Sequence, residues 1–251
     1  MPTVFFGHGS PMNALGGPHA EVWRQIGRSL PRPRAVLMVS AHWYVEGIGV
    51  TAMERPPTIH DFYGFPPELD AVRYPAPGAP WLARRVAELI AGVQENHEWG
   101  LDHGTWSVLV HGFPQADVPV VQLSLDIMRP PADHLALARS LKPLRDEGVL
   151  VAGSGNIVHN LRLARWGKGA PAYDWAVRFE ARVRDLIIAG DDAALAAYES
   201  LGEDARLSVP TPEHYLPLLY VLAQRDASEP ASCFNEGIDL GSISMLGVKI
   251  G

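Results

Sequence analysis

Three apolar runs in this sequence each lead into a polar loop that contains a histidine, and this repetition constrains the fold more than any other feature. The runs are Thr3 to Phe6, Ala35 to Val39 and Val149 to Ala152. A short, continuous apolar run predicts a β-strand that is covered on both faces. We therefore expect three buried strands, followed in order by His8, His42 and His159.

Segments with apolar residues at helical spacing separate these runs, and they predict an α/β fold. The expected helices are Glu21 to Ser29, Pro80 to Val93, Pro131 to Leu144, Tyr173 to Ala189 and Ala193 to Ser200, and further strands are expected at Val118 to Leu123 and Gly241 to Val248. Such alternation indicates βαβ units and a central, largely parallel or mixed sheet flanked by helices. A chain of 251 residues with 47% hydrophobic content can bury one core. We expect a single domain, residues 1–251.

Charge and cysteine content exclude several classes of protein. The formal net charge of −7 disfavours nucleic acid and anionic membranes as partners. Cys233 is the single cysteine, so there is no intramolecular disulfide framework and no Cys-rich zinc module. No signal peptide or long apolar span is readable, which favours a cytoplasmic protein. The sequence does not predict an oligomeric state.

The positions of the histidines predict a metal centre. Ligand sites of parallel sheets lie outside the carboxyl ends of the strands, where His8, His42 and His159 are expected. Protonated imidazoles would repel one another there, whereas neutral imidazoles bind a divalent cation well. A single histidine is more often a packed or surface residue, but several at such positions favour one shared divalent metal ion.

A fourth candidate lies near the end of the chain. Thr211 and Pro212 match the N-cap and first position of a helix, which would put His214 in its first turn. The neighbouring Glu213 is an alternative ligand, and would complete the two-histidine, one-carboxylate triad of non-haem iron enzymes. The residues alone leave both alternatives open.

Other readings of these loops are weaker. Gly153-Ser154-Gly155 lacks the third glycine of a dinucleotide fingerprint and the lysine of a phosphate-binding loop. The Gly-x-Ser-x-Gly elbow of serine hydrolases is absent as well. His19, His97, His111 and His134 are interpreted as surface or helix residues and receive no role.

The segment from Thr51 to Pro80 is rich in proline, glycine and aromatic residues and predicts a long functional loop. Its aromatic residues Phe62, Tyr63 and Phe65 would wall a bound ring and exclude water, or pack within the loop itself. His60 is a further candidate for contact with the substrate.

The ordered motifs resemble the class III extradiol ring-cleavage dioxygenases, with the 4,5-DOPA dioxygenase type as the nearest branch. The motifs, which run over most of the chain, are Gly7-His8-Gly9-Ser10-Pro11-Met12, Ser40-Ala41-His42-Trp43, Thr58 to Pro66, Leu101-Asp102-His103-Gly104-Thr105-Trp106, Pro119 to Ser124, Gly153 to Leu161 and Thr211-Pro212-Glu213-His214-Tyr215. In order and combination they are far more specific than any one of them alone.

The resemblance implies an enzyme that opens a catecholic, DOPA-like ring with molecular oxygen. His8, His42 and His214 would be the metal ligands, and His159 the acid or base beside the metal, or a fourth ligand. His103 matches a motif histidine on the substrate side. Relatives are described with iron(II) or zinc, and only iron supports oxygen chemistry by electron transfer. A zinc hydrolase and a non-enzymatic binding protein of the same fold are the alternatives.

Overall fold

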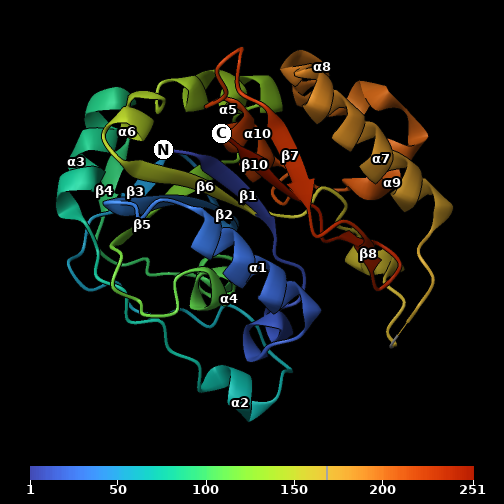
Figure 1. The fold of residues 1–251 in the computed structure, drawn as a ribbon, viewed down its shortest axis with the longest axis horizontal. Helices are drawn as coiled ribbons and strands as arrows, with labels where there is room; N and C mark the ends of the chain where they lie inside the picture. The colour runs from blue at the N-terminus through green and yellow to red at the C-terminus, as the bar shows by residue number, and fades with distance from the viewer. Residues whose placement is uncertain (168) are drawn as a thin grey trace.

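One mixed sheet of eight strands forms the centre of the molecule (Figure 1). The computed structural model describes residues 1–167 and 169–251. The strand order is β4-β3-β5-β2-β6-β1-β10-β7, in which β5, β2, β6 and β1 are parallel to one another. The neighbouring strands β3 and β10 run antiparallel to this centre; β4 is parallel to β3, and β7 is antiparallel to β10. The expected α/β fold with a mixed sheet is therefore confirmed.

Strands β1, β2 and β6 each begin at the first residue of the apolar run that predicted them. In chain order the strands are β1 (Thr3–Gly7), β2 (Ala35–Val45), β3 (Gly49–Thr51), β4 (Gln94–Asn96), β5 (Val120–Asp126), β6 (Val149–Gly155), β7 (Ala231–Phe234) and β10 (Gly247–Ile250), with β8 (Ile238–Asp239) and β9 (Ile243–Ser244) forming a separate pair. Side chains of β2 alternate between two hydrophobic clusters, Leu37 in one and Met38 in the other. Both faces of the central strands are thus covered, which explains why their sequences are apolar without alternation.

Helices cover the two faces unequally. They are α1 (Pro18–Ser29), α2 (Pro67–Asp70), α3 (Pro80–Leu89), α4 (His103–Gly112), α5 (Pro131–Arg139), α6 (Pro143–Asp146), α7 (Asp174–Ala189), α8 (Asp192–Ala196), α9 (Glu203–Ser208) and α10 (Leu216–Leu222), with short 3₁₀ turns at Pro11–Leu15, Leu161–Leu163 and Tyr198–Leu201. Trp23 of α1 and Trp106 of α4 belong to one cluster, whereas residues of α3, α5, α7 and α10 belong to the other. In Figure 1, α1 and α4 accordingly lie below the sheet and α5, α6 and α10 above it.

Several predicted boundaries are wrong for local reasons. Strand β2 continues to Val45, because the β-formers Trp43, Tyr44 and Val45 carry it past a bulge after Val39. His42 therefore lies inside a strand and not beyond its end. The expected helix at Pro131 divides at Ser140, the helix at Pro80 ends at Leu89, and the tail forms two short strands.

Two motifs that contain histidines adopt different local structures. The motif from Leu101 to Trp106 contains the start of α4, because the Asp102 carboxylate accepts a hydrogen bond from the backbone N–H of Thr105 and caps the helix. His214 does not lie in a helix: residues 210–215 form turns, and α10 begins only at Leu216.

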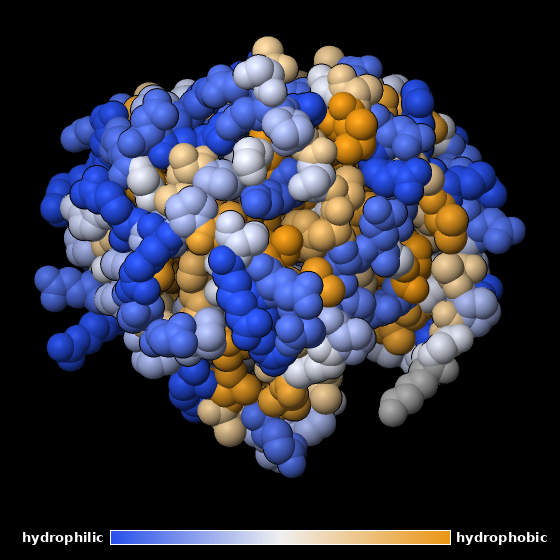
Figure 2. Space-filling model, in the orientation of Figure 1, coloured by the Kyte–Doolittle hydropathy of each residue, from blue (hydrophilic) through white to orange (hydrophobic). Residues whose placement is uncertain are grey.

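The surface in the view of Figure 2 is mixed, with charged and polar side chains spread around smaller hydrophobic patches. None of the described helices combines the length and apolar character that a membrane crossing requires.

Candidate metal centre

Three imidazoles from distant parts of the chain meet at one point. His8 follows β1 directly, His42 lies in β2, and His214 precedes α10. One ring nitrogen of each lies within 4.8 Å of the others. The Nε2 atoms of His8 and His42 are only 3.2 Å apart. The structure thus brings together three histidines that were expected to share a metal.

Hydrogen bonds at Nδ1 fix the tautomers of two of these rings. The Ser154 hydroxyl donates to the Gly104 carbonyl at 2.5 Å, so it can only accept from His8 Nδ1, which is 2.9 Å away. The Glu213 carboxylate accepts from His214 Nδ1 at 3.1 Å. In both rings the proton is therefore on Nδ1, and the Nε2 lone pair is available to a cation.

Two glycines allow the backbone to approach this point closely. A Cβ on Gly155, at the end of β6, would lie 2.1 Å from the His214 carbonyl oxygen. A Cβ on Gly104, in the first turn of α4, would lie 2.8 Å from Cδ2 of His42. Any larger residue at either position would push a histidine away from the shared point.

Burial keeps the three imidazoles neutral. It lowers the pKa of His8, His42 and His214 well below the ordinary value, and the neighbouring histidines lower these pKa values further. Neutral imidazole is the form that binds metals. The chemistry of the donor set therefore fits a divalent cation.

His159 lies beside this group but is arranged differently. Its ring stacks on that of His214, with the centroids 3.5 Å apart. It falls in a separate group of metal-capable side chains with Glu213 and His214, and not in the group that contains His8 and His42. Burial, followed by the proximity of His103, lowers the pKa of His159 to about 4.

His103 lies on the other side of the three histidines. Two carboxylates that the sequence did not indicate, Asp61 and Asp102, lie next to it. His103 Nδ1 lies 2.9 Å from Oδ2 of Asp61, and the same oxygen is 3.4 Å from Nδ1 of His42. Asp102 is fully buried beneath them, which raises its pKa to about 6, and it accepts a hydrogen bond from Ser40. Asp61 adjoins the candidate His60 in sequence, and a carboxylate between candidate residues was the signal that could have found it.

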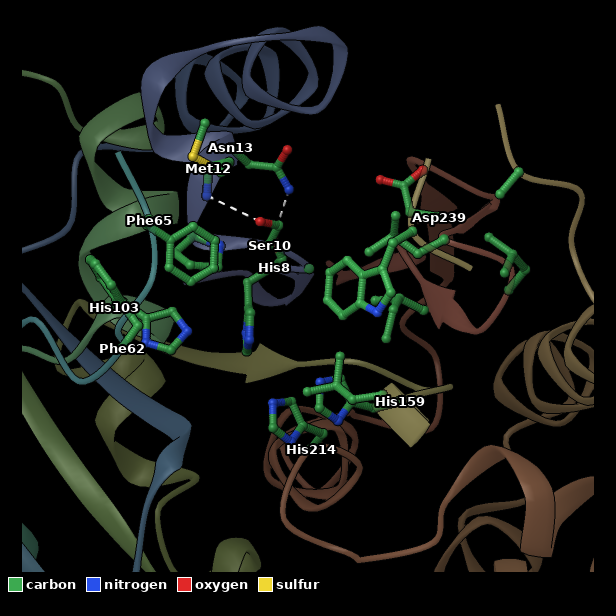
Figure 3. A pocket seen from close by; sticks show the side chains of 18 of the residues that line it. His8, Ser10, Met12, Asn13, Phe62, Phe65, His103, His159, His214 and Asp239 are labelled. Carbon is green, nitrogen blue, oxygen red and sulfur yellow. Dashed lines mark hydrogen bonds between the residues drawn. The ribbon is translucent and has the colours of Figure 1, made fainter. Parts of the chain in front are cut away.

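A cavity of about 850 Å³ opens onto the histidines. His8, His42, His103, His159 and His214 all line it. Figure 3 shows His103 with Phe62 and Phe65 on one side and His159 with His214 on the other, with His8 between them. A cavity of this volume suits a small organic molecule.

Of the four residues predicted to contact a substrate, the structure brings two to the cavity. Phe62 and Phe65 line it, and their rings pack edge to face. Tyr63 is 95% exposed and does not belong to the lining. His60 lies behind Phe62, where Nε2 donates to the Val72 carbonyl at 3.0 Å.

The remaining wall was not foreseen. It is formed by side chains from the 3₁₀ turn Pro11–Leu15, from the segment after His159 and from the β8–β9 hairpin, chiefly Met12, Leu161, Trp166, Ile238, Leu240 and Ile243. Met12 and Leu161 belong to motifs named above, but those motifs did not predict a role for the two side chains. Only the tertiary fold brings these segments together.

Comparison with known proteins decides what kind of site this is. Residues 3–230 match the model of the catalytic LigB subunit of aromatic ring-opening dioxygenase. The chain belongs to this family. It is thus a class III extradiol dioxygenase, an enzyme that opens an aromatic ring with both atoms of dioxygen and that depends on a metal ion.

Similar proteins extend over the whole chain. A protein from Escherichia coli K12 described as 4,5-DOPA dioxygenase extradiol is 50% identical over 100% of this chain and 95% of its own length. One of the same description from Beta vulgaris is 34% identical over 96% of this chain and 93% of its own. A crystal structure of an uncharacterized protein from Escherichia coli K12 has a TM-score of 0.88 and 45% identity, with both chains covered completely. These likenesses favour the dioxygenase over the hydrolase and binding-protein alternatives.

Proposed function

We propose that this dioxygenase uses iron(II) to open the ring of a catechol of the DOPA type. The observation that carries the proposal is the convergence of His8, His42 and His214 on one point at the floor of the cavity. The substrate class is that of the similar proteins described as 4,5-DOPA dioxygenases. We propose further that residues 1–251 act as one catalytic domain in the cytoplasm, with a small catechol and dioxygen as partners.

The three histidines suit one shared ion. Two nitrogens that each bind an ion at about 2.1 Å lie about 3 Å apart. The Nε2 atoms of His8 and His42 are separated by 3.2 Å. The buried ring of His8 directs its Nε2 lone pair toward Nε2 of His42, and two such lone pairs repel each other. A cation between them would turn this repulsion into attraction.

Iron(II), when bound, supplies acidification of the catechol hydroxyls and a path for electrons from the ring to oxygen. His8, His42 and His214 would hold it on one side, which leaves the cavity side to the substrate. Glu213 orients His214 through Nδ1 and is not itself needed as a ligand. Zinc would fit the same nitrogens but has no redox chemistry, so a zinc form would be inactive.

His159 is the residue that we propose as acid and base. Its ring lines the cavity and is held in place by stacking on His214. A neutral imidazole at this place can accept a proton from a catechol hydroxyl and return it during ring opening. We keep His159 outside the ligand set, because it is not grouped with His8 and His42.

The aromatic side of the cavity would orient the substrate ring. Phe62 and Phe65 present apolar surface next to His103, and an aromatic ring packs favourably against such side chains. The same surface excludes water from the reacting atoms. His103, on the substrate side of the metal, is the second proposed catalytic residue.

The experiment is reconstitution of the metal-free protein. Protein loaded with iron(II) without oxygen and then mixed with L-DOPA in air should consume oxygen and form a yellow semialdehyde product. Protein loaded with zinc should bind the ion but consume no oxygen. Absence of oxygen uptake by the iron form, with L-DOPA and with simple catechols, would refute the proposal.

A further inference from the structure

Asp61 contacts both a proposed metal ligand and a proposed catalytic residue with the same oxygen. Its Oδ2 is 2.9 Å from Nδ1 of His103 and 3.4 Å from Nδ1 of His42. Its other oxygen, Oδ1, accepts the backbone N–H of His103 at 2.9 Å. The two imidazole rings lie side by side, with 3.8 Å between their centroids.

Both oxygens of this side chain face nitrogen atoms: Oδ1 faces the backbone N–H of His103, and Oδ2 faces the two Nδ1 atoms. A carboxylate is an acceptor only. A negatively charged oxygen near a ring nitrogen favours the tautomer whose proton is on that nitrogen. Asp61 therefore favours the Nδ1–H form of His42 and of His103 together.

The consequence concerns the opposite nitrogen of each ring. In the Nδ1–H form, His42 has its lone pair on Nε2, the atom that faces Nε2 of His8. His42 would otherwise be the one ring of the three without a partner at Nδ1, because Ser154 serves His8 and Glu213 serves His214. The same form leaves the Nε2 of His103 able to accept a hydrogen bond from a molecule in the cavity.

We propose that Asp61 is a positioning residue that sets the tautomer and orientation of His42 for the metal and of His103 for the catechol at the same time. This inference rests on the ligand set proposed above. Carboxylates behind a metal-bound histidine raise metal affinity by 10- to 100-fold. Asp61 differs from such a residue because it also acts on His103, which faces the substrate.

The test uses the zinc-loaded protein and the chromophoric catechol 4-nitrocatechol, whose absorption changes with ionisation, and neither requires oxygen chemistry. In Asp61→Asn, we expect about 10- to 100-fold weaker zinc binding in competition with a chromophoric chelator. At saturating zinc, the variant should also bind 4-nitrocatechol at least several-fold more weakly. Failure of the iron and oxygen assay would leave both measurements intact, so the two proposals fail separately.

Glu213→Gln is the matched control, because Glu213 orients a metal ligand but does not touch His103. It should weaken zinc binding, but in the zinc-saturated protein it should weaken 4-nitrocatechol binding much less than Asp61→Asn does. The pair His103→Phe and His103→Phe with Asp61→Asn completes a cycle: the catechol effect of Asp61→Asn should vanish in the His103→Phe background, while the zinc effect persists.

Circular dichroism and the thermal midpoint verify that each variant folds. If Asp61→Asn does not, Asp61→Glu keeps the charge but displaces the oxygens by one methylene, and smaller losses in both affinities are expected. Equal affinities in wild type and variant would overturn the proposal. So would two zinc ions per wild-type chain of which Asp61→Asn loses one, because Asp61 would then be a ligand.

Discussion

The rings of His159 and His214 are stacked, with 3.5 Å between their centroids and 8° between their planes. His214 is in turn oriented by its hydrogen bond to Glu213. No group among the described residues hydrogen-bonds to the His159 ring, in contrast to the rings of His8 and His214. The stack therefore holds His159 in place and leaves its nitrogens free for a molecule in the cavity.

Replacement of His159 separates these two properties. His159→Phe keeps an aromatic ring on His214 but removes the proton acceptor, so it should bind one metal ion as wild type does. Its kcat/KM should fall by about 100- to 10,000-fold, the range for loss of a general acid or base. Metal analysis and oxygen consumption measure the two effects. Retention of most activity would show that His159 does not transfer protons.

Helix α4 approaches β2 so closely at Gly104 that one added methyl group should lower both stability and metal affinity. In Gly104→Ala, the new Cβ would collide with Cδ2 of His42 at 2.8 Å and with Oγ of Ser40 at 2.6 Å. We expect a loss of about 1–3 kcal/mol in stability and weaker metal binding.

Gly112→Ala, in the same helix, is the control. Its Cβ would meet only the Trp23 carbonyl oxygen at 3.8 Å, which is an ordinary contact. Alanine at this helical position should be neutral or stabilising by up to about 1 kcal/mol. If thermal melting and metal titration do not distinguish the two variants, the space around His42 is larger than the structure indicates.

The metal-free protein should lose stability as the pH falls. Burial lowers the folded-state pKa of His8, His42 and His214 well below the 6.5 that is ordinary for histidine. Between the folded and unfolded pKa values, the unfolded chain therefore binds protons that the folded chain does not, and stability rises with pH through this window. Thermal midpoints measured from pH 7 to pH 5 should decrease, and saturating zinc should raise them at pH 7. A constant midpoint across this range would contradict the lowered pKa values.

Phe62 and its neighbour Tyr63 should behave oppositely although the sequence predicts the same role for both. Phe62 lines the cavity and packs against His103, whereas Tyr63 is 95% exposed. Phe62→Ala should raise KM for a catechol about tenfold or more, because it removes apolar contact with the ring. Tyr63→Ala should leave KM within about twofold. Steady-state kinetics of both variants test this directly, and equal effects would place the substrate elsewhere.

Much of the fold could be predicted because the central strands are buried on both faces. Their apolar runs, such as Val149 to Ala152, are distinctive in sequence, and the parallel arrangement then directs the loops that follow to one edge. His8 and His159 follow from this logic. His42 was expected at the same edge for a wrong reason, since the strand continues past it.

The parts that could not be predicted depend on contacts between distant segments. Asp61 gains its position only because the loop from residue 51 to residue 80 packs on the start of α4. Trp166 and Leu240 reach the cavity from irregular segments without periodicity. The start of α10 was placed too early, because Thr211 bonds to the Glu213 side chain instead of capping the helix.

The distribution of the ligands along the chain has a consequence for how the enzyme is made. His8 and His42 emerge from the ribosome early, but His214 follows only after most of the polypeptide has been synthesised. No nascent fragment that lacks the last fifth of the chain can therefore assemble the complete set of nitrogens. If these three histidines hold the metal as proposed, the complete site can be filled only late in synthesis.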